Sequence, residues 1–520
     1  MWLEICLTSH LICSAPTVAP LPTRVIDVGS PDGSQTPYLL VTRGRRGSYA
    51  TLSHRWGTTE TLATTTKNMH EHQERIDMSV VPKTFQDAIA ITRRLGLQYL
   101  WIDCFCIVQD SVRDWRSESE NMCSICENSL LCISATAAID SHAGIFSDRE
   151  IDTVVLHREI DSETQELGAR CMAQSFADAI SSSVLENRAW CMQERLLAPR
   201  VLHYTQSQLF WECKHSISSE SNQNELRNPE IDLKRSITAN MEDRVAGSAP
   251  YLLTWYTLLE SYTKKALTVN SDRLLAVAGL ADKFRKHLAA QYLWGLWEDD
   301  LHLGLLWRRA TKRHTQQILS RDRYATRTCY YDTSPSTVEG VPTWSWAAVE
   351  GPITYSGPDL PITTHRTEHS SDAAFDRKLL QNDNENGRLS IASGLHVRAC
   401  VIRGCCKSRS RDAPEADVVF RAAGMRSNAE VLTCILDIDD VPPKSCYCMR
   451  VALGGSRAQS RRRDETTRAY YLLLQKYQGP MESTDRESLG CFKRLGMGSD
   501  VPKKVDRLFA NAAVHSLVLV

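Results

Sequence analysis

The sequence predicts an α/β fold: a core built on a parallel sheet, then a helical segment and a β-rich C-terminal region. Residues 49–102 read as strand, long loop, helix and strand, which is a crossover unit that joins two parallel strands. The second of these strands, 99–102 (YLWI), is apolar on both faces, as is typical of a strand in the middle of a parallel sheet. Beyond residue 351, turn-rich stretches alternate with short strand patterns, which predicts the β-rich region.

The size and charge of the chain exclude several classes of protein. Its 520 residues suffice for two to four domains. With 61 Lys and Arg against 62 Asp and Glu, the chain has no general attraction for nucleic acid, so we expect no nucleic-acid partner. No apolar run approaches the roughly 18 residues that span a bilayer. The 18 cysteines are scattered and no secretory signal precedes them, which favours a reducing, cytoplasmic location.

The N-terminal residues predict a helix that presents Trp2, Leu3, Cys6 and His10 to the core. Cys6, His10 and Cys13 could instead be three zinc ligands, but no fourth ligand follows at zinc-finger spacing. We therefore expect no metal site. Because the chain starts in mid-helix, we also expect its true beginning to be missing.

Composition divides the chain into five segments. They are an N-terminal helix at 1–19, the α/β domain at 20–215 with its core motifs at 49–195, a polar linker at 216–250, a helical region at 251–350 and the β-rich region at 351–520. The elements expected in the α/β domain are hairpin strands 25–28 and 38–41, a strand 49–53, a helix 84–95, the strand 99–102, a helix from 114, a strand 130–135, a strand pair within 147–185, a helix 187–197 and a hairpin of 201–204 with 209–213. Downstream we expect helices from 251, over 272–286 and over 293–308, and then strands at 389–391, 395–402, 431–438, 450–453, 470–474 and 515–520.

Two helices of the α/β domain carry start and stop signals. Thr84 with Asp87 three residues later predicts a capping box, and Gly96 predicts the end of that helix. Asp114 predicts the start of the next helix. On that helix Glu118 falls on the same face as apolar residues such as Met122, so its carboxylate loses hydration on burial.

Other motifs carry little weight. Cys123 and Cys126 have the C-x-x-C spacing, but they lie in mid-helix without a second pair. No Gly-rich phosphate loop precedes a Gly-Lys-Ser/Thr, which argues against P-loop nucleotide hydrolysis. Ser53 and His54 are adjacent on a strand and point to opposite faces, so they do not form a hydrolase pair.

Five short motifs follow one another between residues 49 and 195. They are 49–57 (YATLSHRWG), 81–89 (VPKTFQDAI), 99–110 (YLWIDCFCIVQD), Asp114-Trp115 with Glu118 and Met122, and 188–195 (RAWCMQER). Together they resemble the heterokaryon-incompatibility (HET) domain proteins of filamentous fungi. The chain departs from that pattern at His54 and Cys126, where Tyr is more usual, and at Phe105, where a smaller residue is usual.

The resemblance implies a role in fungal non-self recognition, in which incompatible partners trigger cell death. It also implies a flavodoxin-like parallel sheet, because HET domains look distantly similar to Toll/interleukin-receptor (TIR) domains. Some TIR domains cleave NAD with a glutamate beside the sheet edge, so NAD is a candidate substrate here by analogy. No firm cofactor is implied.

Glu118 is the first candidate for the catalytic carboxylate, since a carboxylate near the ribose can stabilise an oxocarbenium-like state. A buried ion pair of Glu118 with Arg55, Arg93 or Arg94 is the structural alternative. Glu194 is the second candidate, and it too faces inward. Its structural alternative is a contact with Arg188 or Arg200.

Four residues at the expected sheet edge are candidates for binding the substrate, because ligands gather at the carboxyl ends of strands in open α/β sheets. Asp103 could bind a ribose hydroxyl or a loop amide. Trp56 could stack on a nicotinamide or adenine ring, or close the core. Ser53 and Arg55 lie in the same turn.

Two other hypotheses about function stay open beside the enzymatic hypothesis. The domain could signal without catalysis, through self-association or by binding a partner domain. The chain could also be an inactive member of the family.

Overall fold

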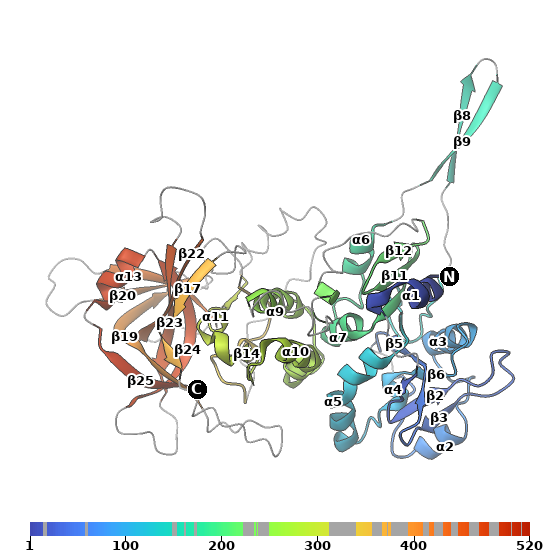
Figure 1. Cartoon of the computed structure of the whole chain (residues 1–520), viewed down its shortest axis with the longest axis horizontal. Helices are drawn as coiled ribbons and strands as arrows, with labels where there is room; N and C mark the ends of the chain where they lie inside the picture. Colours follow the sequence, from blue (N-terminus) through green and yellow to red (C-terminus); the bar gives the residue numbers. More distant parts are fainter. Residues whose placement is uncertain are drawn as a thin grey trace.

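The computed structural model describes most of the chain. The described residues are 1–13, 18–57, 61–147, 153–160, 163–170, 174–221, 233–235, 237, 249–310, 340–355, 367–371, 373–375, 394–408, 415–420, 430–437, 446–456, 467–477, 488–500, 502–510 and 512–520. The strand predicted at 389–391 lies outside them. The described residues form a mixed α/β domain, a helical region and a β-rich region, arranged in that order across Figure 1.

The α/β domain is built on an eight-stranded sheet in the order β12-β11-β10-β7-β5-β6-β2-β3. Its strands are β2 (Arg24–Asp27), β3 (Tyr38–Val41), β5 (Tyr49–Ser53), β6 (Tyr99–Trp101), β7 (Leu131–Ser134), β10 (Arg200–Tyr204), β11 (Leu209–Cys213) and β12 (Ile217–Ser219). β12 lies in the stretch predicted as a linker, most of which falls outside the described residues.

Only the middle of this sheet is parallel. β5 pairs in parallel with β6 and with β7, and β7 pairs in parallel with β10, which confirms the crossover unit predicted for residues 49–102. The outer strands are antiparallel, because the hairpins β2–β3 and β10–β11 close the two sides. The sheet is therefore mixed rather than wholly parallel.

Both predicted helices exist and begin within two residues of the predicted positions, but the predicted capping residues are wrong. α3 (Lys83–Arg94) begins after Pro82, and the Asp87 carboxylate accepts from the Ile145 N–H instead of capping the helix. α5 (Val112–Asn128) is capped by Ser111, whose side chain accepts from the Asp114 N–H. Asp114 lies in the first turn, where its negative charge interacts favourably with the positive end of the helix dipole.

The predicted stop of α3 is confirmed. Gly96 adopts a φ of +71° directly after Leu95, and its N–H donates to the Arg93 carbonyl. A left-handed residue at this position favours glycine. The chain turns there into β6, and a four-residue helix, α4 (Asp103–Cys106), follows that strand directly.

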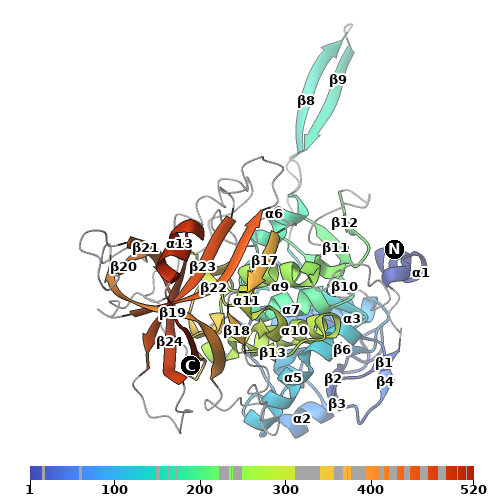
Figure 2. The same ribbon diagram turned by 60° about the vertical axis from the view of Figure 1, so that its left-hand side comes forward.

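The segment after β7 contains the predicted strand pair, β8 (Thr153–Ile160) and β9 (Glu163–Arg170). This hairpin projects away from the body of the molecule in both views (Figures 1 and 2). Two helices follow, α6 (Phe176–Ser181) and α7 (Ala189–Leu197), and α7 packs against β5.

At the N-terminus lie α1 (Trp2–Ser9), the 3-10 turn η1 (Leu11–Cys13) and a short pair of β1 (Ala19–Pro20) with β4 (Arg46–Gly47). A further short helix, α2 (Met69–Glu74), lies next to β3.

The helical region contains α9 (Ala249–Tyr262), η3 (Asn270–Arg273), α10 (Leu275–Leu288), η4 (Glu298–Asp300), α11 (Leu301–Gly304) and η5 (Trp346–Ala348). The continuous helix predicted over 293–308 is wrong. Instead, β13 (Tyr292–Leu293) and β14 (Leu296–Trp297) form a hairpin, with Trp294 and Gly295 both at positive φ in its turn. β15 (Arg308–Arg309) pairs with β16 (Ile353–Thr354).

The helical region docks on the α/β domain through α10, which packs against α5 and α7. Gly279 lies at the contact, and its N–H donates to the Gln193 side chain at 3.1 Å. A Cβ at Gly279 would lie 2.7 Å from the Cys123 Cβ. α7 is therefore held between β5 and the helical region.

The β-rich region is a nine-stranded sheet in which β19 also pairs with β22, so that the strand pairings close into a ring. Its strands are β17 (Thr367–Ser371), β18 (Ala374–Phe375), β19 (Leu395–Ser408), β20 (Glu415–Phe420), β21 (Glu430–Leu436), β22 (Cys446–Ser456), β23 (Thr467–Lys476), β24 (Ser488–Asp500) and β25 (Val514–Leu519), and it includes the helix α13 (Pro502–Phe509). The strands predicted from 395, 431, 450, 470 and 515 are confirmed, whereas β20, β24 and α13 have no counterpart in the prediction.

One buried arginine joins this region to the helical one. The Arg494 guanidinium donates to the Leu305 and Trp307 carbonyls and pairs with Asp437 at 2.7 Å. It also lies 3.6 Å from the centroid of the Trp307 ring. No helix in the described part of the chain is long and apolar enough to cross a membrane.

Candidate functional site

The carboxyl ends of the parallel strands meet at one edge of the sheet. Ser53 is the last residue of β5 and pairs in register with Ser134, the last residue of β7. Asp103 begins α4 two residues beyond the end of β6. This edge is where the sequence predicts a ligand site.

Trp56 and Asp103 are in direct contact at this edge. The Trp56 indole N–H donates to Asp103 Oδ2 at 2.8 Å, and the Cys104 N–H donates to Asp103 Oδ1 at 2.8 Å. The His54 ring lies beside the same carboxylate, with Nδ1 3.8 Å from Oδ1. Burial lowers the pKa of His54 to about 4, so this imidazole is neutral at pH 7.

Glu194 on α7 belongs to the same group. Ser53, Arg188 and Asp103 are all close enough to act on the charge of its carboxylate. Burial raises the pKa of Glu194 to about 7, an effect that Ser53 and Arg188 oppose and Asp103 reinforces. The carboxyl is therefore about half protonated at neutral pH, as general acids and bases require.

Arg188 fixes the start of α7 against the edge. Its guanidinium donates to the His54 carbonyl, and the neighbouring Ala189 N–H donates to the Ala266 carbonyl of the helical region at 3.0 Å. Arg188 also acts on the charge of Glu194, whereas Arg200 lies elsewhere, against Cys6 and Cys13.

Glu118 lies in a different environment. It is 2% exposed on α5, and its Oε1 is 3.7 Å from the Arg24 guanidinium, which pairs more closely with Asp114 at 2.6 Å. Burial raises the pKa of Glu118. The ion-pair partner is Arg24 rather than Arg55, Arg93 or Arg94, because β2 places its first residue beside α5.

Arg55 contributes its backbone to this edge. Its carbonyl accepts from the Ser141 hydroxyl at 3.4 Å, and the Trp56 carbonyl accepts from the same hydroxyl at 3.1 Å. Among the predicted residues, the structure therefore brings together Ser53, Trp56, Asp103 and Glu194.

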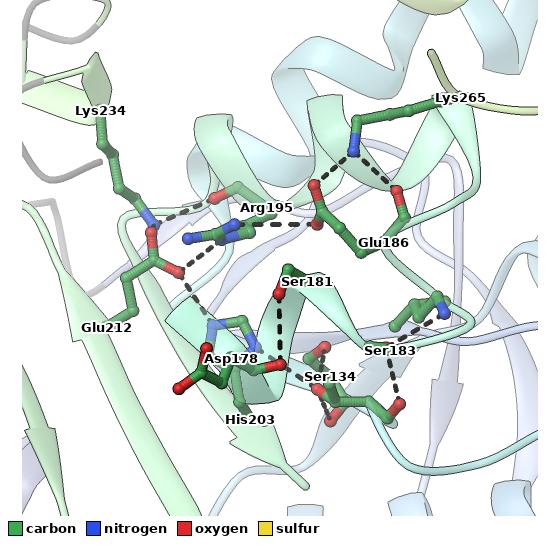
Figure 3. A network of polar contacts seen from close by, with 12 residues as sticks. Ser134, Asp178, Ser181, Ser183, Glu186, Arg195, His203, Glu212, Lys234 and Lys265 are labelled. Carbon is green, nitrogen blue, oxygen red and sulfur yellow. Dashed lines mark hydrogen bonds and ion pairs between the residues drawn. The ribbon is translucent and has the colours of Figure 1, made fainter. Parts of the chain in front are cut away.

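A buried polar network adjoins the edge at β10 and β11 (Figure 3). Glu212 is fully buried and pairs with His203 Nε2 and with Arg195 Nε, both at 2.8 Å, and with Lys234 at 3.6 Å. Although burial opposes its charge, Arg195 and Lys234 hold the pKa of Glu212 well below its usual range. Glu212 is therefore a fixed anion rather than a proton carrier.

The network continues through hydroxyl groups toward Ser53. His203 Nδ1 lies 3.4 Å from the Thr136 hydroxyl, which is 3.0 Å from that of Ser134. A small cavity is lined by these three side chains together with Ser53 and Cys191. The space that a water molecule can occupy inside it is about 20 Å³, which is room for a single water.

One group at the edge has metal-ligating atoms close together: His54, Asp103 and Cys104. However, the Cys104 sulfur lies 3.9 Å from His54 Nε2, whereas Asp103 faces Nδ1 on the other side of the ring. The imidazole therefore separates the thiol from the carboxylate, which does not favour a shared ion.

Sequence reasoning missed His203 and Glu212 as parts of this site, and it named Arg188 only as a contact of Glu194. Arg188 is the first residue of the motif 188–195. Only the structure shows that its guanidinium binds the His54 carbonyl and so fixes the start of α7 against the sheet edge. His203 and Glu212 occupy the two strands of a predicted hairpin at diagonal positions, since His203 pairs with Phe210 and Glu212 pairs with Val201. Polar residues on an inner hairpin strand are a usable signal of a buried polar network.

Comparison with known proteins gives one family. Residues 49–194 match the model of the family described as heterokaryon incompatibility protein (HET), as the five motifs predict. No curated protein and no solved structure gives a significant match to the chain. The flavodoxin- or TIR-like character of the sheet thus stays a prediction.

Proposed function

We propose that this chain, which carries a HET domain over residues 49–194, is an effector of heterokaryon incompatibility that triggers cell death after non-self recognition. HET domains are associated with heterokaryon incompatibility. The killing activity and its chemistry are our proposal.

The proposed chemistry is the hydrolysis of NAD at the carboxyl edge, with Glu194 as the key carboxylate. The observation that carries this proposal is the environment of Glu194, whose pKa of about 7 arises where Ser53, Asp103 and Arg188 surround it. Perturbed carboxyl groups of this kind concentrate at functional sites. The analogy with TIR domains supplies the reaction.

In the proposed reaction the bond between the ribose C1′ and the nicotinamide nitrogen breaks, and its electron pair leaves with nicotinamide. The ionised Glu194 carboxylate stabilises the positive charge that develops on the ribose. Water then adds to C1′ and loses a proton, which gives ADP-ribose. Asp103 is suited to accept from ribose hydroxyls, and Trp56 offers an aromatic surface to a nucleotide ring.

Glu194 is preferred over Glu118 because of their partners. The Glu118 carboxylate is 2% exposed and faces Arg24 and Asp114, a typical structural arrangement for a buried acid. Glu194 is partly exposed, and Ser53 and Asp103, two of the candidates for binding the substrate, both act on its charge.

A second candidate function is signalling without catalysis, through self-association or a partner domain. The observation in its favour is the cavity, whose room for one water is far too small for a dinucleotide. A dinucleotide therefore cannot occupy this cavity, whose lining includes neither Glu194 nor Asp103, whereas a signalling module needs no such site.

Expression of the full chain in a filamentous fungus separates these functions. The variants are Glu194→Gln, Glu118→Gln and, as a matched control, Glu120→Gln on the exposed face of α5. We expect the wild type and the Glu120 variant to kill cells and deplete NAD, and the Glu194 variant to do neither at equal protein level. Killing with unchanged NAD would support the signalling function. Loss of NAD depletion in a stably folded Glu118→Gln protein alone would move the catalytic role to Glu118.

A further inference from the structure

Four side chains from opposite ends of the α/β domain meet in the interior. Cys6 is in α1, His10 follows α1, Cys13 ends η1, and Cys213 ends β11, about 200 residues later. One ligand atom from each lies within 4.8 Å of every other. All three cysteines are at most 1% exposed.

The chemistry and spacing of this group suit a zinc ion. Three Cys sulfurs and one His nitrogen form one of the standard ligand sets of structural zinc sites. With Zn–S bonds of about 2.3 Å in a tetrahedron, neighbouring ligand atoms are separated by about 3.8 Å. The Cys213 sulfur lies 3.5 Å from His10 Nδ1, close to that edge length.

The groups around the sulfurs also fit thiolates. The Ser216 N–H donates to the Cys213 sulfur at 3.3 Å, in the turn that follows β11. Arg200 Nε donates to the Cys6 sulfur at 3.2 Å. Donors of this kind commonly surround the ligands of structural metal sites and fix their orientation.

Arg200 supplies an independent argument. Its side chain is fully buried, and its hydrogen-bond partners are the Cys6 sulfur and the carbonyls of Cys13 and Leu130, none of which is a carboxylate. A buried guanidinium requires an opposite charge nearby. Three thiolates with one Zn²⁺ carry a net charge of −1, which matches the single positive charge of Arg200.

We propose that Cys6, His10, Cys13 and Cys213 bind one Zn²⁺ ion. Because all four positions of the ion are filled by protein ligands, the site is structural rather than catalytic. It joins the N-terminal segment, which lies outside the HET family match, to the β10–β11 hairpin. The fourth ligand comes from the far end of the domain, so no zinc-finger spacing appears in the sequence.

The first experiment measures zinc in the full chain, purified without added metal or chelator, by elemental analysis. We expect about one zinc per chain. After chelation, titration with Co²⁺ should give the visible absorption of a tetrahedral thiolate site and saturate at one equivalent. Zinc removal should also expose residues 1–13 to protease before the rest of the domain.

Variants then assign the ligands. Cys213→Ser and His10→Ala should each lower the affinity for zinc by more than about 100-fold, which is the upper end of what the loss of a supporting residue costs. Cys123→Ser is the matched control, because Cys123 lies on α5 outside the group, and it should retain full zinc. The wild-type measurements stand even if a ligand variant fails to fold.

Three results would overturn the proposal. They are a wild-type chain that contains no zinc and takes up no Co²⁺, a disulfide between two of the three cysteines in the intact protein, and full zinc retention by a folded Cys213→Ser chain.

Discussion

Replacing Glu194 by Gln tests the electrostatics of the carboxyl edge without changing its shape. In the folded chain burial raises the pKa of this carboxyl from 4.5 to about 7. The folded state therefore binds a proton more tightly than the unfolded state, and between these two values stability falls as the pH rises. Gln carries no charge at any pH, so the variant escapes that loss.

The size of the effect follows from the two pKa values. Each tenfold change in proton affinity is worth about 1.4 kcal/mol, so the charged carboxylate costs the folded wild type about 3 kcal/mol above pH 7. The side chain is partly exposed, and solvent screening reduces this figure. We expect the variant to gain about 1–3 kcal/mol on the wild type between pH 4.5 and pH 8.

The assay is urea unfolding of both full-length proteins at several pH values between 4.5 and 8. Groups such as His54, whose pKa burial lowers to about 4, contribute equally to both proteins and cancel in the difference. Glu120→Gln on an exposed position serves as the control and should show no pH-dependent difference. A difference between the Glu194 variant and the wild type that stays constant over this range would refute the reasoning.

Two further predictions concern packing and buried charge. Gly279→Ala should destabilise the contact of α10 with α7 by about 1–3 kcal/mol. The reason is that the new Cβ would lie 2.7 Å from the Cys123 Cβ and 2.7 Å from Gln193 Oε1. A raised melting temperature of the variant would contradict this close contact. Glu212→Gln should cost about 3–5 kcal/mol, since it leaves buried cations without their anion. In the same denaturation assay Asp282→Asn, which removes an exposed ion pair, should cost under about 1 kcal/mol, and equal losses for the two would contradict the account.

Local patterns predicted the sheet well. The run 99–102 and the strand at 49–53 became the parallel pair β6 and β5, because short apolar segments need burial on both faces. The two hairpins beside them are confirmed for a similar reason, since each pairs strands that are close in sequence.

Errors arose where a local signal competed with a more distant partner. Asp114 looks like a helix cap, but its carboxylate accepts from Arg24, 90 residues earlier, and Ser111 caps the helix instead. Over 293–308 the apolar spacing suggests a helix. There Gly295 approaches Trp346 so closely that the chain turns sharply at positive φ.

The same limit applies to the site. The sequence placed Ser53, Trp56 and Asp103 at one edge, because strand order along a crossover unit fixes where strands end. It could not decide between Glu118 and Glu194, since both face inward on their helices. The choice depends on the partner of each carboxylate, which is Arg24 for Glu118 and Ser53 for Glu194. Only the folded chain reveals these partners.

Nicotinamide release from NAD by the purified full-length chain tests the proposed activity most directly. We predict that the wild type releases nicotinamide and ADP-ribose in equal amounts, and that its rate increases as the pH rises through about 7, where Glu194 ionises. We predict no release by Glu194→Gln, although this variant is expected to be at least as stable as the wild type. Release at equal rates by both proteins, or by neither under conditions in which the wild type kills cells, would contradict the assignment of catalysis to this edge.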